Sequence, residues 1–177
     1  MCIATNELGG KIMFKGLRKK LERKFKTATV IGGPVEGELV SIKEVNDPTF
    51  SAELLGKGVA IKPSKGRVVA PADGIIDMIF DTNHAVSLVT DTGVELLIHI
   101  GIDTVKLKGK YFRGFVKAGE KVKAGQLLIE FDLNAIEDEG YDTICPIVIC
   151  NSGEYENIES AAGGRIKELD EVITIKN

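Results

Sequence analysis

The sequence predicts an all-β fold: a single antiparallel β-sandwich or barrel-like domain with short helical turns and a basic N-terminal arm. Short runs rich in Val, Ile and Leu alternate with turn residues from about residue 37 to the end of the chain. Turn sequences at Pro63–Gly66 and Pro71–Gly74 separate several of these runs. Many short strands at this spacing are typical of a sandwich or barrel.

Composition supports one globular domain. The chain has 177 residues, of which 44% are hydrophobic and 28% charged. No apolar run approaches the ~20 residues of a membrane span, and the start of the chain lacks the features of a secretory signal. Because Cys2, Cys145 and Cys150 are odd in number and contain no Cys-x-x-Cys, we expect buried thiols in a reducing cytoplasm.

Charge divides the chain into a basic arm, residues 1–26, and an acidic body, residues 27–177. Eight Lys or Arg and one acid, Glu22, lie in residues 11–26, a balance of +7. The net charge of −3 therefore leaves −10 for the rest. An acidic body repels phosphate, so we do not expect nucleic acid to bind.

The arm is predicted to be flexible, with a basic amphipathic helix over residues 11–26. Its apolar residues recur every four positions, at Met13, Leu17, Leu21 and Phe25. Such a helix suits an anionic membrane surface, which would place the protein at the inner face of the membrane. Docking of the helix on its own domain or on a partner is the alternative.

The body is predicted to contain nine strands and one short helix. Asp132 is expected to cap the helix, which runs over residues 132–140, and residues 47–50 are expected to form a loop. The strands are expected at residues 37–45, 58–62, 67–70, 74–80, 84–89, 94–100, 121–131 with a turn at 124–125, 144–150 and 168–175.

The only two histidines, His84 and His99, flank a predicted β-hairpin. With a two-residue loop at Asp91 and Thr92 they would lie opposite each other, their Cβ atoms about 4.5–5.5 Å apart. A three-residue loop with Gly93 in the left-handed conformation would shift the register by one, and Thr92 is poorly suited to the shorter turn. Both registers remain open at this point.

A lone histidine in an apolar strand is usually a core or surface residue, but here the hairpin brings two together. Adjacent imidazoles are costly to charge together, so at least one should stay neutral and nucleophilic near neutral pH. Gly101 leaves backbone room for a large group to approach. Two chemistries suit this pattern: metal binding, and transfer of a phosphoryl group through an imidazole nitrogen.

A zinc peptidase fits this sequence poorly. There is no third histidine and no His-x-His pair at His99, so a catalytic zinc would lack ligands. His84 and His99 would hold zinc only if a partner supplied a carboxylate, which keeps a shared interfacial zinc as an alternative. No cofactor is otherwise required.

Longer segments around both histidines carry a family resemblance. They are Val94–Gly109 and Thr82–Ala85, with further similar segments at residues 56–63, 69–74 and 126–132. On these residues, the chain from about Val30 to Ile175 resembles the glucose-type enzyme IIA component of the bacterial phosphoenolpyruvate-dependent sugar phosphotransferase system. The resemblance implies an antiparallel β-sandwich with a shallow active site.

The resemblance also implies a phosphotransferase that works through a phosphohistidine during sugar uptake. His99 matches the histidine phosphorylated on Nε2, His84 the neighbour that hydrogen-bonds the phosphoryl group, and Thr82 the hydroxyl that orients this neighbour. Judged without the resemblance, Thr82 would be explained by β-propensity. The implied donor is the phosphorylated histidine-containing phosphocarrier protein, charged by enzyme I. The implied acceptor is a cysteine of a sugar-specific IIB domain of a membrane permease.

Partner docking implies an apolar surface around the histidines with polar edges. Phe50 fits such a surface because it falls in an expected loop, whereas Phe80, Leu97 and Val105 could equally be core. An acidic body suits basic partners. A regulatory binding module that docks without taking up phosphate is the rival hypothesis. The residues at the family's rim positions are Phe50, Leu54, Leu55, Phe80, Leu97, Asp103 and Val105.

Overall fold

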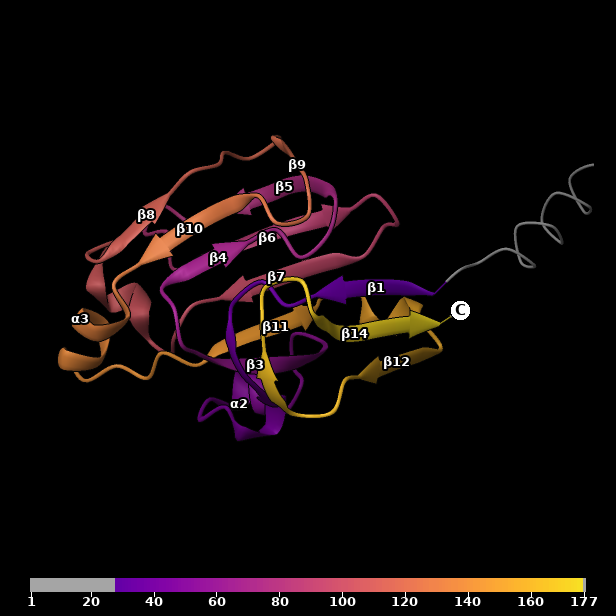
Figure 1. Cartoon of the computed structure of the whole chain (residues 1–177), viewed down its shortest axis with the longest axis horizontal. Helices are drawn as coiled ribbons and strands as arrows, with labels where there is room; N and C mark the ends of the chain where they lie inside the picture. The colour runs from indigo at the N-terminus through magenta and orange to yellow at the C-terminus, as the bar shows by residue number, and fades with distance from the viewer. Residues whose placement is uncertain (1–27, 177) are drawn as a thin grey trace, which may run out of the picture.

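The computed structural model describes residues 28–176. The predicted helix at residues 11–26 lies outside this range, so that helix and its membrane contact stay predictions. All strand pairs of the described residues are antiparallel, and helices are few and short (Figure 1). The all-β prediction is confirmed. Within residues 28–176, no helix has the length and apolar character needed to span a membrane.

One large sheet runs through the molecule, with eight strands in the order β13-β2-β3-β11-β7-β6-β5-β9. The β6–β7 hairpin lies inside this sheet, flanked by β5 and β11. In chain order its strands are β2 (Gly37–Ser41), β3 (Lys57–Pro63), β5 (Gly74–Ile79), β6 (Ala85–Thr90), β7 (Glu95–His99), β9 (Lys121–Val122), β11 (Cys145–Ile149) and β13 (Gly164–Ile166).

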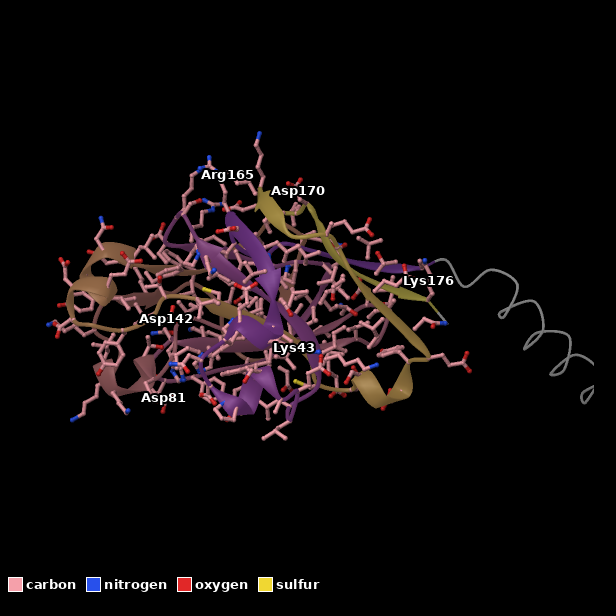
Figure 2. All side chains as sticks on the ribbon, turned by 90° about the horizontal axis from the view of Figure 1, so that it is seen from below. Lys43, Asp81, Asp142, Arg165, Asp170 and Lys176 are labelled. Atoms are coloured by element: carbon pink, nitrogen blue, oxygen red, sulfur yellow. The ribbon has the colours of Figure 1, made fainter. Side chains whose placement is uncertain are left out.

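Two three-stranded sheets complete the sandwich. One has the order β4 (Arg67–Val69), β10 (Leu127–Phe131), β8 (Phe112–Gly114), and the other β1 (Thr29–Gly32), β14 (Glu171–Lys176), β12 (Asn157–Ser160). A continuous core joins all three sheets, with Ile98 from the large sheet, Ile129 from β10 and Ile173 from β14 in the same buried cluster. Charged side chains such as those of Arg165 and Lys176 project from the edges of this body (Figure 2).

Sequence patterns located the longer elements well. The predicted helix appears as α3 (Leu133–Asp138), and Asp132 Oδ1 accepts the capping hydrogen bond from the Ala135 N–H at 3.0 Å. The strands β1, β8, β12 and β13 were not predicted. Each has only three or four residues and at most two buried ones, so apolar alternation has no room to show.

Two expectations near residue 45 were wrong. The predicted strand over residues 37–45 ends at Ser41, whose hydroxyl accepts a hydrogen bond from the Lys43 N–H and begins the 3-10 helix η1 (Ile42–Glu44). The predicted loop at 47–50 is largely the one-turn helix α2 (Pro48–Ser51). Asp47 caps α2, because its Oδ1 accepts from the Thr49 N–H at 2.8 Å.

The expectation of buried thiols is confirmed for one of the two cysteines that the structure describes, and Cys2 lies outside residues 28–176. Cys145 in β11 is fully buried, and burial raises the pKa of its thiol to about 12. Cys150, just after β11, is exposed rather than buried. The strand ends at Ile149, and Cys150 lies in the turn that follows, where its N–H donates to the Glu95 carbonyl at 2.8 Å.

Candidate active site

The β6–β7 hairpin adopts the three-residue loop. Ala85, not His84, pairs with His99. The Thr90 N–H donates to the Val94 carbonyl, and Gly93 has φ +86°. The register with His84 directly opposite His99 is therefore wrong, because only glycine readily adopts the left-handed conformation that closes this loop.

Cross-strand pairing and a turn together bring His84 to His99, because the Ile100 N–H donates to the His84 carbonyl at 2.8 Å and so continues the hairpin one pair beyond Ala85 and His99. His99 is the last residue of β7, and His84 lies in the turn immediately before β6. Asn83 sits in that turn with φ +54°, a conformation that asparagine tolerates better than most residues. The two imidazole rings meet edge to face, with centroids 5.0 Å apart and planes at 81°.

A backbone carbonyl fixes the tautomer of His99. Its Nδ1 lies 2.7 Å from the Gly101 carbonyl oxygen, which can only accept, so Nδ1 carries the proton. Nε2 then holds the lone pair. No hydrogen bond to this Nε2 is found among the described residues, and Nε2 is not a fully enclosed atom without a partner. His99 is half-buried, so Nε2 keeps some contact with solvent.

Gly101 has a different role from the one expected. It adopts φ +72°, and a Cβ there would lie 2.6 Å from both the Asp142 carbonyl oxygen and Thr104 Cγ2. The missing side chain therefore makes room for the Asp142 backbone and for the methyl group of Thr104. The sequence suggested that Gly101 leaves room for a large group to approach, but in the structure the protein itself fills this space.

Thr82 contacts His84 as the resemblance implied. Its Oγ1 lies 2.5 Å from His84 Nδ1. If the hydroxyl donates, Nδ1 is the acceptor and Nε2 carries the proton, so His84 can offer that N–H to an anion beside His99. Asn83, to which sequence analysis assigned no role, lies between these two residues in the left-handed conformation.

Both imidazoles are poor bases in this site. Burial, and then the neighbouring His99, lowers the pKa of His84 from 6.5 to about 4. Burial also lowers the pKa of His99, while the hydrogen bond to Gly101 and the negative charges of Asp47 and Asp103 act in the opposite direction. Two neutral rings at neutral pH agree with the expectation from their adjacency.

Two phenylalanines pack against the histidines. The Phe50 ring lies 5.2 Å from that of His99, and the Phe80 ring lies 5.1 Å from that of His84, both measured between centroids. Phe50 is only 5% exposed and belongs to a second buried cluster with Ile42, Val45, Ala60, Ile144 and Val148. Phe50 is a core residue of α2 that packs against His99. The argument that it lies in a loop and is therefore exposed was wrong.

The other predicted rim residues vary in exposure. Leu54 and Leu55 follow α2 and are exposed, as is Val105 in the 3-10 helix η2 (Thr104–Leu107). Leu97 is half-buried against the second cluster. Asp103 is exposed and forms an ion pair with Lys106 at 2.7 Å. Their role in docking stays a prediction.

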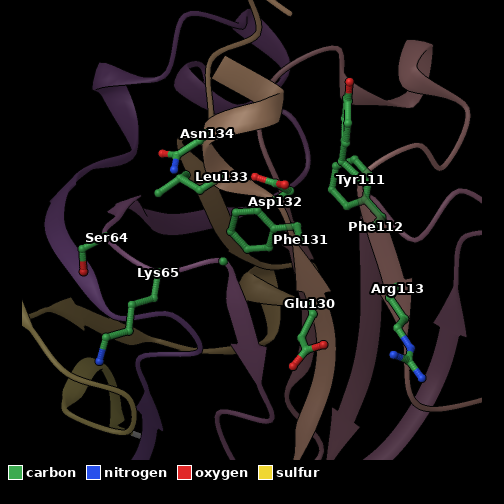
Figure 3. A pocket seen from close by; sticks show the side chains of 11 residues that line it. Ser64, Lys65, Tyr111, Phe112, Arg113, Glu130, Phe131, Asp132, Leu133 and Asn134 are labelled. Atoms are coloured by element: carbon green, nitrogen blue, oxygen red, sulfur yellow. The ribbon is translucent and has the colours of Figure 1, made fainter. Parts of the chain in front are cut away.

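No complete metal site is found in the part of the chain that the structure describes. Within residues 28–176, no three His, Cys, Asp or Glu side chains are grouped to hold a metal ion. A zinc ion on His84 and His99 would thus need ligands from outside these residues. A cavity of about 640 Å³ lies elsewhere, lined by residues 64–66, 111–113 and 130–134, and neither histidine is among them (Figure 3).

Comparison with known proteins places this geometry in context. Residues 29–155 match the family model "phosphoenolpyruvate-dependent sugar phosphotransferase system, EIIA 1". A glucose-specific EIIA component of this system from Oceanobacillus iheyensis is 41% identical over 148 residues, which cover 84% of this chain and 89% of that protein. The structure of the glucose permease IIA from Mycoplasma capricolum matches with a TM-score of 0.81 at 34% identity, covering 86% of this chain and 98% of that one.

Other relatives are much longer. A beta-glucoside-specific EIIBCA component from Dickeya chrysanthemi is 47% identical over 133 residues, which cover 75% of this chain and 21% of that protein. The chain spans about a fifth to a quarter of the length of several such curated relatives.

Proposed function

The chain belongs to the EIIA 1 family of the phosphoenolpyruvate-dependent sugar phosphotransferase system, and on this basis we propose that His99 carries a phosphoryl group between proteins during sugar uptake. One observation supports this role above all. His99 Nδ1–H is held by the Gly101 carbonyl, which leaves the lone pair on an accessible Nε2.

The proposed cycle has two transfers. The Nε2 lone pair of His99 attacks the phosphorus of the phosphohistidine on the histidine-containing phosphocarrier protein. The donor's phosphorus–nitrogen bond breaks, and its electron pair stays on the donor imidazole. In the second step a cysteine thiolate of a IIB domain attacks the same phosphorus, and His99 leaves with its lone pair restored. Such transfers depend mainly on positioning and charge stabilisation.

His84 suits the role of a neutral hydrogen-bond donor to the phosphoryl oxygens. Its pKa of about 4 keeps the ring uncharged near neutral pH, and Thr82 holds its Nδ1. A charged neighbour would stabilise the phosphohistidine more strongly and slow the release of the phosphoryl group. A neutral donor beside His99 therefore favours a carrier over a stable phosphoprotein.

The proposed partners are the phosphocarrier protein and a IIB domain. The IIB partner is supported by relatives whose names combine IIB, IIC and IIA in one component. The exposed Leu54, Leu55 and Val105 would contribute apolar contacts at the docking surface, with Phe80 and Leu97 beside the histidines and Asp103 at the polar edge. The negative charge of the body would speed encounter with basic partners.

Phosphate uptake separates this proposal from a regulatory module. The protein is incubated with phosphoenolpyruvate, enzyme I and the phosphocarrier protein, and we expect acid-labile, base-stable phosphate on it. His99→Ala should abolish labelling, whereas His84→Gln should still fold and should impair onward transfer. Labelling that survives in the His99 variant would mean that the nucleophile is misassigned. Binding of the phosphocarrier without any labelling of the unmodified protein would favour the regulatory module.

A further inference from the structure

Two consecutive peptide groups after His99 are each hydrogen-bonded at both ends. In the first, the Ile100 carbonyl accepts from the Thr104 hydroxyl at 2.5 Å, and the Gly101 N–H donates to the Ile144 carbonyl at 3.1 Å. In the second, the Gly101 carbonyl accepts from His99 Nδ1–H at 2.7 Å, and the Ile102 N–H donates to the Asp142 carbonyl at 2.9 Å. Apart from His99 itself, Thr104 supplies the only side-chain oxygen or nitrogen among these partners, and the buried Cys145 thiol also lies against the Gly101 backbone.

Thr104 is enclosed where it makes this contact. Its side chain is fully buried, and its methyl group occupies the space next to the Cα of Gly101. Thr104 begins η2, yet its hydroxyl reaches back four residues to Ile100. A buried hydroxyl requires a partner, and the Ile100 carbonyl is the one that the described structure provides.

The two peptide groups are linked through the Cα of Gly101 and can rotate relative to each other about its φ and ψ. Glycine has the widest backbone freedom of any residue, so without constraints on both sides the second carbonyl could rotate away from the imidazole. Thr104 constrains the first side through Ile100. Loss of its hydroxyl would leave the Gly101 carbonyl less firmly placed over His99 Nδ1.

We propose that Thr104 is a positioning residue for His99: through the Ile100–Gly101 peptide its hydroxyl keeps the Gly101 carbonyl on Nδ1, and thereby keeps the lone pair on Nε2. The kinetic consequence rests on the proposed phosphoryl-carrier function. The effect on the tautomer does not, because it follows from the hydrogen bonds alone.

Three variants isolate the hydroxyl. Thr104→Val removes it and keeps the side-chain volume, whereas Thr104→Ser keeps the hydroxyl and removes the methyl group. Thr90→Val is the matched control. Thr90 is also buried, and its hydroxyl accepts from the Val94 N–H at the far end of the same hairpin. Urea denaturation checks that every variant folds, and Thr104→Ala replaces Thr104→Val if the valine variant does not.

Nitrogen NMR of the histidine rings reports the tautomer directly. We expect Thr104→Val to shift His99 from the Nδ1–H form towards a mixture with the Nε2–H form, while Thr104→Ser and Thr90→Val keep the original tautomer. Phosphoryl transfer from the phosphorylated phosphocarrier, measured in a single turnover, should slow roughly 10-fold in Thr104→Val, which is the lower end of the loss seen when a partner that orients a metal-binding histidine is removed. The concentration of phosphocarrier at half-saturation should not change.

An unchanged His99 tautomer in a folded Thr104→Val, or in the alanine variant that replaces it, would overturn the proposal. The same holds if Thr104→Ser behaves like Thr104→Val, or if Thr90→Val shifts the tautomer as much. If the unmodified protein takes up no phosphate but the tautomer responds as expected, the proposed function fails and the positioning role stands.

Discussion

Acid is expected to destabilise the protein through His84. The side chain is only 5% exposed, and burial, followed by the neighbouring His99, lowers its pKa from 6.5 to about 4. In the unfolded chain the same imidazole takes up a proton near its ordinary pKa. Between these two pKa values the unfolded state binds more protons, so the free energy of unfolding falls as the pH is lowered.

The size of this effect follows from the shift in pKa. Each pKa unit corresponds to 1.36 kcal/mol, so His84 alone should lower the free energy of unfolding by about 3 kcal/mol between neutral pH and pH 4. The lowered pKa of His99 acts in the same direction. Carboxylates with lowered pKa values, such as Asp73 and Glu139, add their own loss of stability as they become protonated below their ordinary pKa.

A comparison with His84→Gln isolates the histidine, because glutamine does not titrate. Between neutral pH and about pH 4, the free energy of unfolding measured in urea should fall by about 3 kcal/mol less in the variant than in the unmodified protein. Proton NMR of the His84 ring should place its titration well below pH 6.5 in the folded protein. Equal slopes for the two proteins, or a folded His84 that titrates at its ordinary pKa, would refute the reasoning.

Three further predictions concern the surroundings of the histidines. Thr82→Val should slow onward transfer roughly 10-fold in single-turnover measurements because His84 Nδ1 loses its partner, and Thr82→Ser should restore the rate. Gly101→Ala should lower the free energy of unfolding in urea by at least about 1–2 kcal/mol, since an alanine is strained at φ +72° and its Cβ would meet the Asp142 carbonyl; unchanged stability would contradict this backbone geometry. Leu54→Ser, at a side chain 72% exposed, should change stability by less than about 0.5 kcal/mol but weaken binding of the phosphocarrier in an NMR titration; unaltered binding would remove Leu54 from the docking surface.

Local sequence patterns were sufficient to predict those elements that are stabilised by interactions between residues close together in the chain. Two short apolar runs separated by the turn sequence Thr90–Gly93 located the β6–β7 hairpin, and the preference of Asp132 for a helix N-cap located α3. A helix of one turn, as at Pro48–Ser51, gives no periodicity to detect, so Phe50 was placed in a loop when it belongs to the core.

By itself the sequence determined that the only two histidines would meet at one end of a hairpin, and the motifs around them identified the family. Only the tertiary structure decided how they meet. The hairpin register depends on the left-handed Gly93, and the approach of His84 depends on the turn at Asn83 and on the bond from the Ile100 N–H to the His84 carbonyl. The proton on His99 depends on the Gly101 carbonyl, whose two flanking peptide groups bond to the Asp142 and Ile144 carbonyls and to the Thr104 hydroxyl. The bonds to Asp142 and Ile144 join backbone groups from distant parts of the chain, and these groups are the same in every residue, so no local pattern of side chains records them.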